Sequence, residues 1–214
     1  MYDQMNKQLF KTTLITFLLS FIYAIIRYNI FKGVLWIHLP LYILNKAISL
    51  TSILLLSVSY FSRIFRPFSK FRKDYSRVMF VWVALVFAFL HSFISVLLMR
   101  PATYPQLFRD SQLNLTGEAS LLLGILTLVA MLGMGGYSFY KKINNSLPIK
   151  HPFFQFLKNG ILYLIGGHVL ILGLNTWLKP KDWPGYMLPI SLISFLAVAF
   201  TVIYRITVKV RKGD

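Results

Sequence analysis

The sequence predicts an all-α membrane protein, a bundle of six transmembrane helices, and three observations predict it. Of the 214 residues, 57% are hydrophobic and only 14% are charged, with a mean hydropathy of +0.64. A soluble domain carries about 25% charged residues. Six apolar segments follow one another, each near the length of about 20 residues that crosses the hydrocarbon core as a helix. Basic residues collect between these segments, as membrane topology signals do. The chain is therefore expected to be a single transmembrane domain.

The first apolar segment has a core, LITFLLSFIYAII, that is short enough to resemble the apolar region of a signal peptide. Arg27 and Tyr28 follow it instead of a small-residue cleavage site, which indicates a retained anchor. Lys11 and Arg27 are placed to extend toward the two membrane surfaces. The third segment is bracketed by Arg77 and Arg100, and the fifth has the same apolar design. The expected helices are 9–30, 41–61, 78–99, 115–137, 153–177 and 187–204.

Basic residues predict the orientation of the bundle. Sixteen of the 23 lysines and arginines fall near the two termini, in the loop between the second and third segments, and in the region between the fourth and fifth. Both termini are therefore expected to be cytoplasmic. The opposite connections, 27–40, 100–114 and 178–185, contain prolines that break helices. Because the longest loops have about 15 residues, we expect no soluble domain, and a flavin-binding reductase would have to be another protein.

Composition also excludes several function classes. The net charge of +17 is better explained by topology than by nucleic-acid binding, because the basic residues lie between apolar segments. With no cysteine, the chain cannot form disulfides, thiolate metal sites or iron–sulfur clusters. No acidic residue falls at the middle of a segment, although proton relays and ion-coupled transporters usually need one there. No HExxH zinc motif is present. Imidazole remains the main candidate for holding a metal or cofactor.

Two histidines stand inside apolar segments, and an ionisable side chain at that depth is a functional-site candidate. His91 lies nine residues before Arg100, and His168 lies nine residues before Trp177. At about 1.5 Å per residue, each lies roughly 14 Å from the outer end of its helix. Two imidazoles at one depth suit the axial positions of a heme iron in a bundle core.

Small residues near these histidines would leave room for a flat macrocycle. Ala84, Ala88 and Ser95 share a helix face with His91, and Gly166 and Gly167 directly precede His168. The same residues also serve plain packing between membrane helices, so this signal is open to either interpretation. The competing class is a non-redox membrane protein, a small transporter or a scaffold for a partner subunit.

The other two histidines are weaker candidates. His151 precedes Pro152 at the cytoplasmic mouth of the fifth segment, where a headgroup, an electron donor or a second cofactor could contact it. His38 lies in the sequence WIHLP before the second segment and is expected at the outer interface. A solvated loop residue is the simpler interpretation for His151, and an interfacial residue for His38.

Three sequence features resemble the ferric reductase-like transmembrane domain family. They are Arg77 followed by VMFVWVALVFAFLH, which ends at His91; the stretch LTGEASLLLGILTL, which contains Gly117; and YLIGGHV, which contains His168. Within that family the chain is most similar to the heme-binding membrane subunits of bacterial periplasmic methionine-sulfoxide reductase systems. The similarity extends from about residue 45 to residue 177.

This resemblance implies a b-type cytochrome of the bacterial inner membrane, with His91 and His168 as axial ligands of heme b. It implies membrane quinol or a flavoprotein reductase as electron donor, and ferric iron or a periplasmic oxidoreductase as acceptor. Family members with two hemes carry further histidines at the positions that Val78 and Gln155 occupy here. One heme per chain is therefore expected. A bound flavin or quinone remains an open alternative as a second cofactor.

Overall fold

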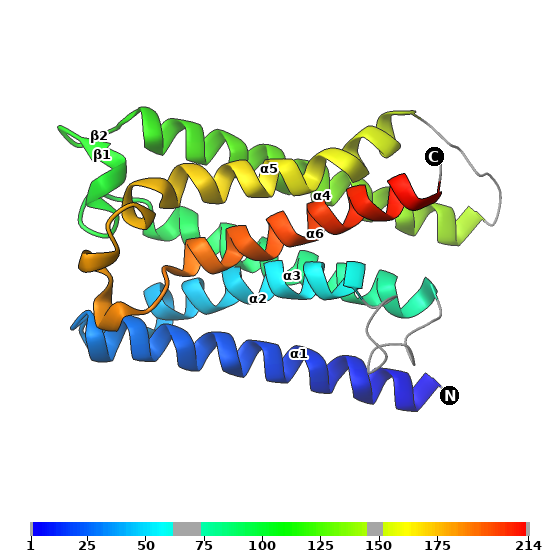
Figure 1. Ribbon diagram of the computed structural model, residues 1–214, viewed down its shortest axis with the longest axis horizontal. Helices are drawn as coiled ribbons and strands as arrows, with labels where there is room; N and C mark the ends of the chain where they lie inside the picture. Colours follow the sequence, from blue (N-terminus) through cyan, green and yellow to red (C-terminus); the bar gives the residue numbers. More distant parts are fainter. Residues whose placement is uncertain (1, 62–73, 145–151, 213–214) are drawn as a thin grey trace.

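A computed structural model of the chain describes residues 2–61, 74–144 and 152–212, and it is almost entirely helical (Figure 1). Six of its helices are long and apolar enough to cross a membrane, as the sequence predicts. Large hydrophobic side chains face outward along them, where lipid would surround the bundle. The bounds of the helices are α1 Tyr2–Ile25, α2 Leu44–Phe61, α3 Asp74–Leu98, α4 Leu115–Asn144, α5 Pro152–Trp177 and α6 Ile190–Lys212.

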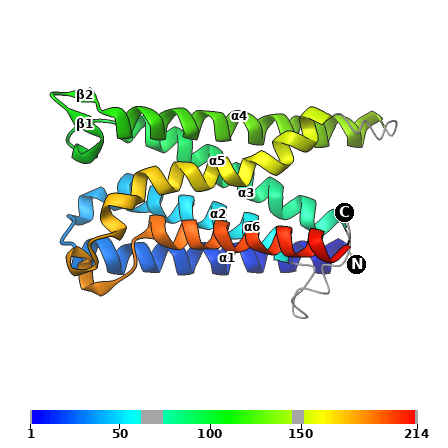
Figure 2. The same cartoon turned by 45° about the horizontal axis from the view of Figure 1, so that its top comes forward.

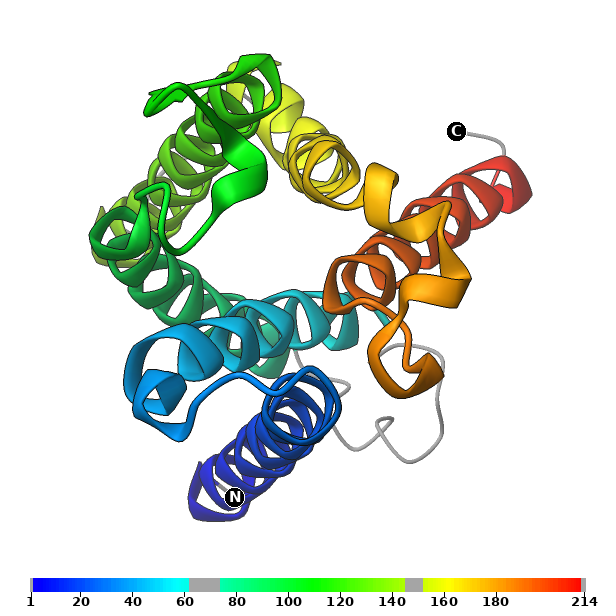
Figure 3. The ribbon, with the colours of Figure 1, turned by 90° about the vertical axis from the view of Figure 1, so that its left-hand side faces the viewer.

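Five helices form a closed ring, and the sixth lies outside it. Each of α2, α3, α4, α5 and α6 packs on the next, and α6 packs back on α2, as the view down the bundle shows (Figure 3). Helix α1 packs on the outer side of this ring, mainly against α2. A turned view separates α4 and α1 to opposite margins of the molecule (Figure 2). Helices α3 and α5, which carry the two candidate histidines, are therefore not neighbours in the ring.

The two ends of the bundle differ in structure. Both chain termini lie at one end, and a small β-hairpin lies at the other, which we call the hairpin end (Figure 1). Strand β1, Phe108–Arg109, pairs antiparallel with β2, Gln112–Leu113. Asp110 and Ser111 have φ values of 50° and 65°, the positive φ at both central residues that a tight type I′ hairpin turn requires. Most of the short helical segments between the long helices also gather at this end.

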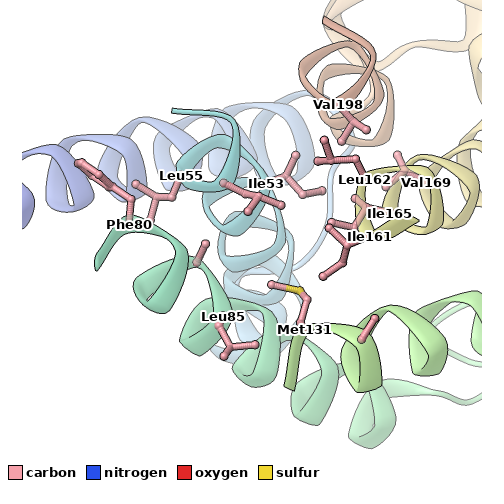
Figure 4. Packing of buried hydrophobic residues seen from close by; sticks show 13 residues of the cluster. Ile53, Leu55, Phe80, Leu85, Met131, Ile161, Leu162, Ile165, Val169 and Val198 are labelled. Atoms are coloured by element: carbon pink, nitrogen blue, oxygen red, sulfur yellow. The ribbon is translucent and has the colours of Figure 1, made fainter. Parts of the chain in front are cut away.

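Hydrophobic side chains from all five ring helices meet near the middle of the bundle (Figure 4). Leu55 of α2, Phe80 of α3 and Leu162 of α5 have no exposed surface. Because lipid is as apolar as these side chains, they stabilise the ring by close packing rather than by removal from water. Hydroxyl groups also join the helices, since Ser52 donates to the Ala84 carbonyl at 2.8 Å. This core fixes the rotation of each ring helix about its axis. It thereby also fixes the direction of the polar side chains that lie nearer the hairpin end.

The observed helix ends depart from the expected ones for identifiable reasons. The first span continues past α1 as a π-helix, η1 Ile26–Phe31, so Arg27 lies within helical structure. The second span begins with η3, Leu39–Ile43, which is also π-helical, before α2 starts. Helix α6 starts at Ile190 rather than 187, directly after Pro189, which suits the start of a helix because it has no N–H. Helices α4 and α6 extend beyond the apolar segments into basic residues.

Candidate functional site

His91 is held by a side chain from the neighbouring helix. Its Nδ1 lies 2.8 Å from Oδ1 of Asn45. The Asn45 amide nitrogen donates to Ser95 Oγ at 3.0 Å, which orients the amide with its oxygen toward the imidazole. Asn45 has no exposed surface. Since an amide oxygen only accepts, Nδ1 of His91 carries the proton and donates, and Nε2 is left as the lone-pair nitrogen.

His168 reaches the same state through a backbone partner. Its Nδ1 lies 2.8 Å from the carbonyl oxygen of Ser120, on α4. A carbonyl accepts and cannot donate, so this contact also places the proton on Nδ1 and leaves Nε2 unprotonated. The Ser120 hydroxyl lies farther away, at 3.4 Å. Gly124, one turn along α4, borders the ring so closely that a Cβ there would lie 3.3 Å from Cε1 of His168.

The two imidazoles belong to one site. They lie on α3 and α5, across the ring from each other, and are close enough for their charges to interact. Both residues are half-buried. Their partners Asn45 and Ser120 belong to the turns of α2 and α4 nearest the hairpin end. The site therefore lies in the half of the bundle nearer that end.

This arrangement has the donor chemistry of a metal site with two imidazole ligands. A ligating histidine usually donates its second ring N–H to a carbonyl or carboxylate, which fixes the tautomer and raises the basicity of the ligand nitrogen. His91 and His168 both satisfy this condition, and each presents Nε2. Within the described ranges, no group of three or more histidine, cysteine or acidic side chains forms. A centre that takes two protein ligands, with its remaining ligands supplied by a macrocycle, matches this donor set.

Of the remaining residues singled out from the sequence, those whose side chains the structure describes make no hydrogen bond to either imidazole. His38 is exposed in the short helix η2, Trp36–His38. His151 falls outside the described residues. Glu118, the acidic residue of the stretch LTGEASLLLGILTL, is exposed on the first turn of α4, and Val78 is exposed on α3. Gln155 belongs to α5.

Three of the small residues noted beside the histidines serve helix packing. Ala84 is fully buried, and its carbonyl accepts the Ser52 hydroxyl of α2. A Cβ at Gly166 would lie 3.5 Å from Val198, and one at Gly167 would lie 3.4 Å from Leu123. The packing interpretation left open by the sequence therefore applies to these three positions. The glycine that borders an imidazole is Gly124, on a different helix.

Sequence reasoning missed four residues of the site: Asn45, Lys46, Ser120 and Gly124. Asn45 and Lys46 form a polar pair inside an otherwise apolar segment, a signal that could have drawn attention to them. Lys46 is half-buried, and its charge acts on both imidazoles. Ser120 contributes mainly its backbone carbonyl, which no residue type could have indicated.

No protein-family model matches the chain, and no curated protein matches it either. The geometry of the two histidines, and of the residues that hold them, is therefore the main indication of function.

Proposed function

We propose that the protein is a b-type cytochrome of the membrane, in which His91 and His168 provide the two axial imidazoles of one heme. One observation carries the proposal: both histidines direct Nδ1–H to an acceptor and so leave Nε2 unprotonated and able to bind a metal. Two unrelated structural histidines have no need to share a tautomer and a depth. Heme bound in this way supplies a one-electron couple whose potential the protein adjusts by burial and hydrogen bonding.

The residues of the chain have separate roles in this proposal. Asn45 and the Ser120 carbonyl orient the imidazoles and increase their electron donation by accepting the Nδ1 protons. The apolar ring helices exclude water, which would otherwise compete for the iron and screen the charges around it. Gly124 leaves the space that a side chain would take from the His168 ring.

We infer an electron path from the direction that the family resemblance implies. Membrane quinol or a separate flavoprotein reductase would donate electrons, and ferric iron or a periplasmic oxidoreductase would accept them at the outer face. His91 lies seven residues before the end of α3 at Leu98, about 10 Å along the helix axis. An acceptor docked at the hairpin end would therefore approach the heme edge more closely than one at the other end.

The proposal places the hairpin end on the outer side of a bacterial inner membrane, with both termini in the cytoplasm. The uneven distribution of lysine and arginine supports this orientation. A reporter that is active only in the cytoplasm should work when fused after Asp214 and should fail when inserted at Tyr104. Activity at Tyr104 would invert the orientation and move the heme to the cytoplasmic half.

Absorption spectroscopy of the purified protein tests the cofactor itself. We expect the sharp, reducible spectrum of a low-spin bis-imidazole heme and about one heme per chain, because the protein has one histidine pair in its spans. A heme analysis by pyridine hemochromogen, set against the protein concentration, gives the ratio. Two hemes per chain would require His151 or His38 as ligands. A colourless protein that stays colourless after heme is supplied would favour the transporter or scaffold alternative.

A further inference from the structure

Three cations gather at the hairpin end around a row of tyrosines, and we call Arg27, Lys32 and Lys46 the basic cluster. Arg27 and Lys32 lie over the ring of Tyr28, with 5.8 and 5.7 Å to its centroid. Lys46 lies over Tyr42 at 5.3 Å and over Tyr104 at 4.8 Å. The tyrosines connect these contacts, since the centroids of Tyr28 and Tyr42 are 5.7 Å apart and those of Tyr42 and Tyr104 are 5.9 Å apart.

The basic cluster lacks an anionic partner in the part of the chain that the structure describes. The acidic residues at this end, Asp110, Glu118 and Asp182, are all exposed. Of these, Asp110 pairs with the exposed Arg109 at 3.9 Å. Partial removal from water, and then the like charges of Lys46 and Arg27, lower the pKa of the Lys32 ammonium. The three cations thus repel one another, and no carboxylate of the described residues lies between them to offset the repulsion.

Arg27 also has a side-chain nitrogen without a hydrogen-bond partner among the described residues. Only 3% of the residue is exposed. One terminal nitrogen donates to the Met187 carbonyl, but the buried Nε has no partner among the described residues. A buried charged group is costly unless it is paired, so this end of the bundle is suited to receive negative charge.

Lys46 connects the basic cluster to the histidine pair. It directly follows Asn45, which holds His91, and its charge acts on both His91 and His168. Among the described residues, its contacts are with the faces of two neutral tyrosine rings. An ammonium inside a membrane span is expected to have a counter-charge or a function. Tyr104, whose ring face contacts this ammonium, is itself buried, with 8% exposed.

We propose that Lys46 binds a carboxylate of the cofactor, a propionate of the heme. The inference rests on the proposed function and names the part of the cofactor that this end of the site recognises. The two propionates leave the macrocycle at one edge, and burying them in an apolar bundle is costly without a cation. Lys46 supplies that cation, and the rest of the basic cluster adds favourable potential at longer range.

A double comparison of protein and cofactor tests this site. Heme-free protein is titrated in detergent with heme b and with heme dimethyl ester, which has the same macrocycle and no carboxylate. The proteins are the unmodified chain, Lys46→Met, Lys46→Arg, and the control Lys181→Met, which removes an exposed lysine at the same end. The growth of the low-spin absorption band gives each dissociation constant, and redox titration gives each midpoint potential.

We expect Lys46→Met to weaken binding of heme b by about 10- to 100-fold, the usual range for losing a charged hydrogen bond. Binding of the dimethyl ester should be the same in both proteins. The heme b potential should fall in Lys46→Met, because the lost positive charge stabilised the reduced iron. Lys46→Arg should keep most of the affinity, and Lys181→Met should behave like the unmodified protein.

Equal loss of heme b and of its dimethyl ester in Lys46→Met would overturn the proposal and assign Lys46 to folding. No loss with either heme would also overturn it, and would leave Lys46 a residue held by its tyrosines or by a free anion. Failure of the unmodified protein to give a low-spin spectrum with either heme is a separate result. That outcome would overturn the proposed function and this inference together.

Discussion

The two histidines of the site have the same tautomer but depend on different kinds of partner. His91 donates to the Asn45 side chain, which Ser95 in turn orients. His168 donates to a backbone carbonyl that belongs to the first turns of α4. The site therefore has two halves, His91 with Asn45 and His168 with the Ser120 carbonyl. The first half can be altered by substituting a side chain, whereas the second is fixed by the fold. The difference predicts an asymmetric response to mutation. Substituting Asn45 on α2 should change heme affinity and midpoint potential, whereas substituting Ser120 on α4 should leave its backbone carbonyl in place.

The largest expected effect comes from removing either imidazole, and here the two halves should behave alike. His91→Ala and His168→Ala should each abolish the low-spin spectrum and release most of the heme, because a bis-imidazole iron needs both ligands. Visible spectra and heme content of the purified variants measure this. His38→Ala, which removes the exposed histidine of η2, is the matched control and should keep the spectrum. A normal low-spin spectrum in either ligand variant would contradict the assignment of that histidine.

A smaller effect should separate the two halves. Asn45→Leu keeps a similar volume but removes the acceptor of the His91 Nδ1 proton, and loss of such a partner typically weakens metal binding by about 10- to 100-fold. The midpoint potential should rise, because a less basic imidazole stabilises the oxidised iron less. Asn45→Asp should lower the potential, because a carboxylate at the same place adds negative charge and accepts the proton more strongly. Heme titration and potentiometry measure both changes.

The matched substitution on the other half should have the smallest effect. Ser120→Ala removes the hydroxyl 3.4 Å from His168 but leaves the carbonyl at 2.8 Å in place. Heme affinity and potential should therefore stay close to those of the unmodified protein. A shift in Ser120→Ala as large as that in Asn45→Leu would show that the hydroxyl, and not the carbonyl, holds the imidazole. That result would contradict the predicted difference between the two halves of the site.

Hydropathy was sufficient to predict the helices, because a span of about 20 apolar residues has few other stable states. It could not predict the π-helical turns at Arg27 and before Leu44, which depend on how the chain enters the bundle. The histidine pair could be selected because ionisable residues inside spans are rare. Its partners could not, because the contacts of Asn45 and Ser120 depend on the rotation of α2 and α4, which the core packing sets.

The closed ring also imposes an order on assembly. Its last contact joins α2 to α6, for example through the Ser57 hydroxyl and the Ala197 carbonyl, 140 positions apart in the chain. Because the chain is synthesised from its N-terminus, three further helices, α3 to α5, are made after α2 and before its second ring neighbour, α6. Both histidines are in the membrane before that neighbour, α6, has been made. The ring around the imidazoles is therefore closed only when the final helix inserts. The four helices that carry the histidines and their partners, α2 to α5, do not close the ring by themselves.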